Sequence, residues 1–155
     1  MHAIPGSDSA DTALFRTLVE ACPDAVIYAD REGAIQVWNG AAERIFGHAA
    51  SDVVGRSLDV IIPERLRNAH WQGFRKALES GETQYSGRVL TTRSVHKNGN
   101  KLYVDLGFSL IRSSDGAVMG ALATARDCTA RYDAERALRA RVSELEQKLE
   151  AASRA

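Results

Sequence analysis

One histidine falls in the middle of an apolar stripe on the longest internal helix that the sequence predicts. The pattern of residues predicts this helix over 65–79, after a proline and before a glycine. At ~100° per residue, positions four apart share one helix face. Here those positions hold Leu66, His70, Phe74 and Leu78, with mostly charged residues on the opposite side.

An imidazole on such a stripe needs a partner, because leaving a buried polar group unpaired costs about 1–3 kcal/mol. His70 is therefore either a core residue whose ring is hydrogen-bonded within the protein or the ligand of a bound cofactor. The sequence contains no Gly-rich phosphate loop, no GxSxG, no HExxH and no paired acid–base residues. We expect a binding function rather than an enzyme.

The elements around this helix predict a mixed α+β domain with an antiparallel sheet. A helix and two strands (25–29 and 34–38) come first, and a short helix (40–46) and the helix 65–79 follow. Strands over 83–95, 102–112 and 117–127 come next, separated by turn residues such as Asn98-Gly99. In the middle strand, Leu106 belongs to an apolar series that alternates with polar residues, so one face is buried. Strands that follow one another without intervening helices argue against a parallel sheet.

Composition narrows the classes of function. Formal net charge is zero, with 45% hydrophobic and 26% charged residues in 155. Nucleic-acid or anionic-membrane binding would favour a basic excess, and no apolar run approaches the ~20 residues of a membrane span. Cys22 and Cys128 are far apart, which argues against a disulfide framework or a zinc site. We expect a cytoplasmic protein that binds neither nucleic acid nor membrane.

The C-terminal segment has the spacing of a coiled coil. Apolar residues recur at intervals of four and three, as in the seam between paired helices, over about two heptads. They are Leu138, Val142, Leu145, Leu149 and Ala152. The N-terminal helix also carries apolar residues at helical spacing, namely Leu14, Phe15, Leu18 and Val19. We predict a homodimer formed through both terminal helices.

Several segments, taken in order, resemble the PAS family from about residue 14 to 131. They are Pro23-Asp24-Ala25, Trp38-Asn39-Gly40-Ala41-Ala42-Glu43-Arg44-Ile45-Phe46-Gly47, Gly55-Arg56-Ser57-Leu58, Lys97-Asn98-Gly99 and Arg126-Asp127-Cys128-Thr129. The resemblance implies a PAS fold: a five-stranded antiparallel sheet with short helices on one face that enclose a small-molecule pocket. It divides the chain into a disordered N-terminus (1–10), a flanking helix (11–22), a PAS sensory domain (23–129) and a signalling, coiled-coil-like helix (130–155).

The final motif has two interpretations. Asp127 can bond Thr129 and the adjacent backbone, which would let strain in the sheet reach the terminal helix. The same residues are equally compatible with a plain helix cap.

The segment from Pro63 to His70 resembles, in spacing, the haem-ligating helix of haem-binding PAS oxygen sensors. Carried over, His70 would ligate the iron of haem b, and Trp71, Phe74 and Leu106 would line the pocket. Gly87-Arg88 resembles the strand whose arginine steadies bound oxygen in those sensors. Two additional residues before the Asn98-Gly99 turn leave the register open, so Leu90 competes with Arg88 for the inward position.

These resemblances favour a sensor of a diatomic gas or of redox state that signals through its flanking helices. No output domain follows residue 155, so we expect a separate signalling protein or an output domain missing from this chain. The alternative is a dimerisation or interaction module whose pocket is empty or holds a small metabolite. A flavin–cysteine adduct is not expected, because Gly40-Ala41-Ala42 follows Asn39 where light-sensing relatives carry cysteine. Non-covalent flavin stays an alternative to haem.

Overall fold

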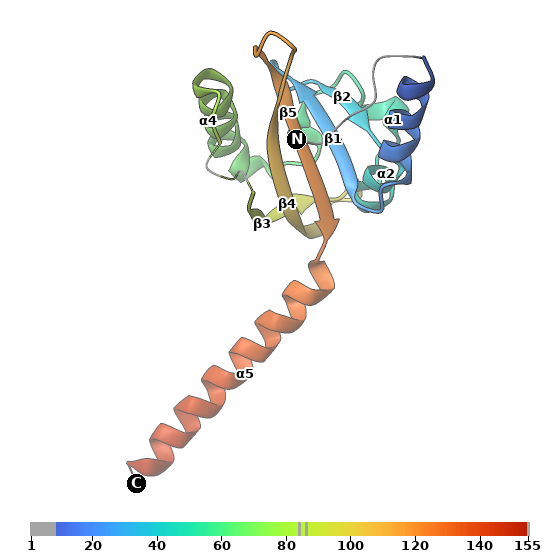
Figure 1. Ribbon diagram of the computed structural model, residues 1–155. Coiled ribbons are helices and arrows are strands. Elements are labelled where there is room, and N and C mark those ends of the chain that lie inside the picture. The colour runs from blue at the N-terminus through green and yellow to red at the C-terminus, as the bar shows by residue number, and fades with distance from the viewer. Residues whose placement is uncertain (1–8, 84, 86, 155) are drawn as a thin grey trace.

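One five-stranded antiparallel sheet organises the chain. The computed structural model describes residues 9–83, 85 and 87–154. The strands lie in the order β2-β1-β5-β4-β3. Their bounds are β1 (Ala25–Asp30), β2 (Ile35–Trp38), β3 (Val89–Val95), β4 (Lys101–Arg112) and β5 (Val118–Asp127). The first and last strands of the domain therefore pair at the centre, which brings both terminal helices to the same end of the sheet (Figure 1).

The described residues also form five α-helices and one short 3₁₀ segment. They are α1 (Ser9–Ala21), α2 (Gly40–Phe46), α3 (Ala50–Val53), η1 (Leu58–Val60), α4 (Glu64–Ser80) and α5 (Thr129–Ser153). Figure 1 shows α1 and α4 at opposite flanks of the sheet and α5 projecting away from it. The predicted fold class, an α+β domain with an antiparallel five-stranded sheet, is confirmed. No helix among residues 9–83, 85 and 87–154 is long and apolar enough to cross a bilayer.

The starts of α1 and β3 differ from the prediction by more than one residue. Disorder was predicted over 1–10, but α1 begins at Ser9, so residues 9 and 10 are helical; residues 1–8 lie outside the described residues. The strand predicted over 83–95 was wrong at its start, because β3 begins at Val89. Two turns precede it: the amide of Tyr85 donates to Oγ1 of Thr83 at 3.2 Å, and the amide of Arg88 donates to the Tyr85 carbonyl at 3.0 Å. These turns bend the backbone away from the ladder.

Asn39 joins α1, β1 and α2. Its buried side-chain oxygen accepts from the amides of Val26 and Ala42, at 2.9 and 3.0 Å, so it caps α2. Its amide nitrogen donates to the carbonyls of Val19 and Asp24, at 2.9 and 3.1 Å. One buried side chain thus satisfies four backbone groups, one each in α1, β1 and α2 and one in the loop before β1.

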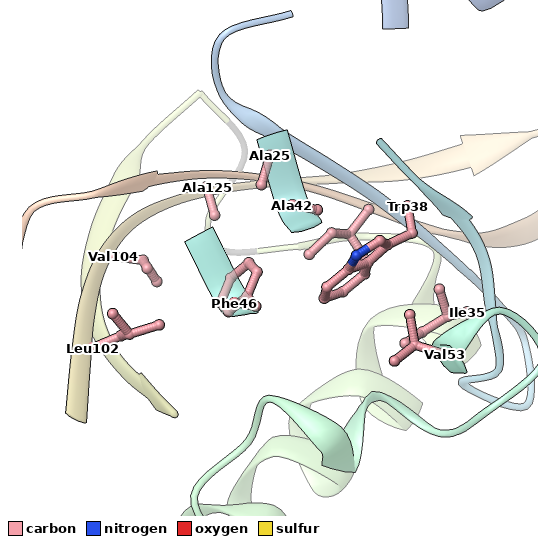
Figure 2. Close-up of a cluster of buried hydrophobic side chains, with 10 residues drawn as sticks. Ala25, Ile35, Trp38, Ala42, Phe46, Val53, Leu102, Val104 and Ala125 are labelled. Carbon is pink, nitrogen blue, oxygen red and sulfur yellow. The ribbon is translucent and has the colours of Figure 1, made fainter. Parts of the chain in front are cut away.

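The concave face of the sheet carries two separate apolar clusters. In the first, Trp38 and Phe46 lie with ring centroids 5.4 Å apart, among residues of β1, β4, β5 and α3 (Figure 2). The second contains Ala29, Phe74, Leu78, Val118 and Ala121, and it holds α4 against the sheet. Between the clusters lie only partly buried residues, among them Leu106 and Ala123. A core divided in this way leaves apolar surface on the concave face that the protein's own side chains do not fully cover.

Helix α5 is attached to the sheet mainly through β4. The amide of Tyr103 donates to Oγ1 of Thr129 at 3.0 Å, and the amide of Cys128 donates to the Tyr103 carbonyl at 2.9 Å. As the sequence predicted, Asp127 contacts Thr129: its Oδ1 accepts from the Thr129 amide and hydroxyl, at 2.9 and 2.6 Å. Arg131 adds an ion pair with Asp105 at 2.6 Å.

Candidate functional site

Helix α4 presents three aromatic side chains toward the sheet. It starts after Pro63 and ends at Gly81, whose φ of 68° is the left-handed geometry that stops many helices. Phe74 is 5% exposed and belongs to the second cluster, whereas His70 and Trp71 are half-buried beside it. The predicted apolar stripe is therefore the face of α4 that meets the sheet.

The imidazole of His70 is held by rings rather than by hydrogen bonds. It stacks on Phe74 with centroids 5.9 Å apart and meets Trp71 edge-on at 4.8 Å. Within the described part of the chain, its Nδ1 is buried and has no hydrogen-bond partner. Burial lowers the pKa of His70 below 6.5, although Asp59 opposes this effect. A neutral imidazole with an unpartnered nitrogen is a potential electron-pair donor to a metal.

Trp71 is fixed on two sides. Its Nε1 donates to Oδ1 of Asp59 at 2.8 Å. Its ring lies so close to Gly33 that a Cβ added there would come within 2.3 Å of two ring carbons. The carboxylate and the glycine therefore set the position of the ring that flanks His70.

The sheet side of the site is apolar and partly open. Leu90 of β3 pairs directly with Leu106 of β4, so both side chains point to the concave face. Leu90 is nevertheless 43% exposed, and Leu106 and Phe108 are only half-buried. On β5, Ala123 is paired with Phe108 and adds little bulk. Solvent therefore reaches apolar side chains on this face of β3 and β4.

Arg88 lies outside the strand on which the oxygen-sensor resemblance would place it. It is exposed and precedes β3 by one residue. Leu90, two residues later, occupies the inward-facing strand position. The structure thus brings His70, Trp71 and Phe74 together on α4. Leu106 packs instead against the first cluster, and Leu90 and Arg88 are exposed.

Sequence reasoning missed Asp59, Gly33 and Phe108. Asp59 lies in the 3₁₀ segment and Gly33 in the β1–β2 turn, and no local pattern links either of them to Trp71. Phe108 belongs to the same alternation of apolar and polar residues along β4 as Leu106, so the sequence did contain a signal for it. A groove of about 410 Å³ was also missed; it lies beside the end of α4 and is lined by Gly81, Glu82, Thr83, Ser109 and Leu110.

The single imidazole of His70 suits a metal that is already coordinated mainly by its cofactor. No three His, Cys, Asp or Glu side chains gather to hold an ion among residues 9–83, 85 and 87–154. A single unpartnered imidazole in apolar surroundings meets the needs of haem, whose iron takes four nitrogens from the porphyrin and an axial ligand from the protein. The chemistry of this imidazole therefore fits the group, and His70 is the residue that would hold it.

Comparison with known proteins supports a sensory family. An uncharacterized protein of Azorhizobium caulinodans is 34% identical over 124 residues, which cover 79% of this chain and 17% of that protein. The oxygen sensor protein DosP of Escherichia coli is 28% identical over 129 residues, covering 83% and 16%. The sensor protein FixL of Bradyrhizobium diazoefficiens is 36% identical over 55 residues, covering 36% and 11%. This chain spans less than a fifth of the length of each relative.

Solved structures agree on the fold. The PAS domain of a Colwellia psychrerythraea protein superposes with a TM-score of 0.67 at 20% identity, covering 77% of this chain and 98% of that one. An RNA-binding Light-Oxygen-Voltage receptor also reaches 0.67, at 19% identity, covering 95% of this chain and 42% of that one. A family model described as PAS fold matches residues 13–128. The chain therefore belongs to the PAS family and is a PAS sensory domain.

Proposed function

We propose that this PAS domain binds haem b through His70 and reports a diatomic gas or a redox change through its flanking helices. The observation that carries the proposal is the His70 imidazole, which is packed among rings and unpartnered at Nδ1, and whose pKa is lowered by burial. We place the protein in the cytoplasm as part of the same proposal.

Two lines of comparison support haem over another ligand. The segment ending at His70 resembles the haem-ligating helix of PAS oxygen sensors, and one relative is named an oxygen sensor. The sensor protein FixL is 36% identical to this chain over 55 residues. Because this chain spans only a small share of either protein, the likeness concerns the sensory domain and not their outputs.

Each residue of the site would have a distinct task. His70 would supply the axial nitrogen, and Phe74 and Trp71 would keep its ring from rotating. Leu90 and Leu106 would line the pocket and exclude water. Bound haem supplies reversible gas binding or a change of oxidation state. Arg88, at the edge, would be the hydrogen-bond donor to the gas if its side chain turned inward.

Strand β4 offers a direct route from this site to α5. Its residues alternate between the two faces of the sheet, so Leu106 faces the site while Tyr103 and Asp105 face outward. The outward pair contacts Thr129 and Arg131 of α5. A shift of β4 caused by ligand would therefore reach the first turn of α5.

An absorption spectrum tests the proposal. Protein produced with added haem should show a Soret band, and His70→Ala should lose most of it. His96→Ala is the matched control, because His96 lies on the β3–β4 turn away from α4, and it should keep the band. Arg88→Ala should keep haem but weaken oxygen affinity. A colourless wild-type protein that refuses added haem, or equal loss in both histidine variants, would contradict the proposal.

A cofactor-free or metabolite-binding interaction module is the second candidate. The exposed apolar side chains Leu14, Phe15 and Leu18 on α1 favour it, because they suit a protein partner. A colourless protein would support this candidate if removal of α1 also lowers its oligomeric state. A yellow protein with flavin absorption instead of a Soret band would point to flavin in the same site.

A further inference from the structure

The turn between β3 and β4 (96–100) is fastened to the end of α2. The amide of Lys97 donates to the carbonyl of Phe46, the last residue of α2, at 2.8 Å. The ring of His96 lies against Gly47, where an added Cβ would come within 2.4 Å of two ring atoms. These contacts join β3 and β4 to a helix that packs in the first core cluster.

His48 is the next residue of the chain, and one nitrogen of its ring has no partner. Among the described residues, nothing bonds to its buried Nε2. The ring meets Trp38 edge-on with centroids 6.5 Å apart, and Nε1 of Trp38 donates to the His48 carbonyl at 3.0 Å. Trp38 belongs to the first core cluster (Figure 2). A protonated ring in this position would hold a buried N–H without an acceptor, which costs free energy.

Three basic residues act on the charge of the His48 ring. Burial is the largest cause that lowers its pKa below 6.5, and Lys97, His96 and Arg56 lower the pKa further. The carbonyl of Val60 opposes them. Two of the three basic residues belong to the β3–β4 turn. A proton on His48 would therefore be repelled by the turn that is docked beside it.

The acidic residues of α2, α3 and η1 have other partners. Oδ2 of Asp52 on α3 accepts from Nζ of Lys97 at 3.2 Å. Oε1 of Glu43 on α2 accepts from the first amide of α3 at 2.6 Å. Asp59 of η1 accepts from the indole on α4 at 2.8 Å. None of the three carboxylates is bonded to His48, so none would hold a protonated ring in place.

We propose that this contact is a pH-sensitive switch, in which protonation of His48 turns its ring out to solvent and releases the β3–β4 turn from α2. The ring binds a proton more weakly in the docked state than in the released one. Docking is therefore complete above pH 6.5 and is lost as pH falls toward the lowered pKa of His48. The turn leads into β4, the strand that is bonded to the start of α5, so acid would act on the strand that carries the C-terminal helix.

Two protons report this contact in the isotope-labelled, ligand-free full chain. They are the amide proton of Lys97 and the indole proton of Trp38, which bond to α2 and to the His48 carbonyl. Nuclear magnetic resonance would follow both from about pH 7.5 to about pH 5. The Trp38 resonance should move with the same midpoint as the His48 ring. After correction for intrinsic exchange, protection of the Lys97 amide should fall by up to about tenfold per pH unit, because one proton is coupled to release.

Three variants separate His48 from the other histidines. His48→Gln removes the titrating group but keeps a polar side chain, so both responses should disappear while the Lys97 amide stays protected at neutral pH. His70→Gln is the matched control, because it removes another buried imidazole whose pKa is lowered by burial, on α4, and it should keep both responses. His96→Gln should keep the Trp38 response with a higher midpoint, because one group that lowers the pKa of His48 is gone.

The midpoints in wild type test the switch even if a variant fails to fold. A Trp38 midpoint that differs from that of the His48 ring would overturn the proposal. So would responses that persist in His48→Gln, or that disappear equally in His70→Gln, since acid would then loosen the domain as a whole. All these measurements use protein without haem, so their failure leaves the proposed ligand untouched.

Discussion

The side-chain rings of Tyr103 on β4 and Tyr132 on α5 stack with centroids 3.6 Å apart and 13° between their planes. Tyr103 also bonds the start of α5 through its backbone amide. Its neighbours on the strand, Leu102 and Val104, belong to the first core cluster. The strand that lines the candidate site is therefore the strand that holds α5, which gives ligand binding a short mechanical route to the C-terminal helix.

Tyr132→Ala should loosen this attachment. Loss of the stack should cost about 1 kcal/mol of unfolding free energy. Hydrogen–deuterium exchange should show lower protection of amides 129–137, with amides of β1 unchanged. Arg136→Ala, an exposed position one turn later, is the control and should leave protection unaltered. Unchanged protection in Tyr132→Ala would mean that the stack does not anchor α5.

Asn39→Ala should be among the most destabilising polar substitutions in this protein. It leaves four backbone groups without their partner, three of them in α1, β1 and α2 and one in the loop before β1. The expected loss is about 3 kcal/mol of unfolding free energy in urea titration. Asn98→Ala removes one bond in an exposed turn and should cost less than about 1 kcal/mol. Similar losses in the two variants would show that Asn39 does not link these elements.

Gly33→Ala should disturb the candidate site through the ring of Trp71. Gly33 has a φ of 81°, and its missing Cβ leaves room for the ring of Trp71. Gly55 has a φ of 83° with nothing within 4 Å of its Cβ position, so Gly55→Ala measures the backbone cost alone. We expect Gly33→Ala to lose about 2 kcal/mol more than Gly55→Ala, and to bind haem more weakly. Equal losses would mean that Trp71 can move aside freely.

Acid should weaken the fold of the ligand-free protein through two histidines. Burial is the largest cause that lowers the pKa of His48 and of His70 below 6.5. The unfolded chain then binds protons more tightly than the folded one, so stability is complete above pH 6.5 and falls as pH drops toward the lowered values. Urea unfolding at about pH 7.5 and about pH 5.5 should show a smaller acid loss in a His48→Gln/His70→Gln variant than in wild type. An identical loss in both proteins would remove these histidines as the cause.

Local patterns predicted the fold well and the site in part. Strand alternation, turn residues and the stripe on α4 were sufficient for the sheet, the long helix and the inward face of His70. The start of β3 was missed because Thr83 and Tyr85 form turns that outweigh the β-preference of their neighbours. The contacts of Trp71 with Asp59 and Gly33 join segments that are 12 and 38 positions distant in the chain. Contacts of that kind follow from tertiary packing and leave no periodic signal.

The proposal that His70 holds haem is tested most directly by removing the imidazole and returning it. His70→Gly should bind haem weakly, and free imidazole should restore the wild-type Soret position and most of the affinity. His96→Gly should bind haem as wild type does and should not respond to imidazole. If His70→Gly binds haem like wild type with no added imidazole, another residue ligates the iron and the account fails.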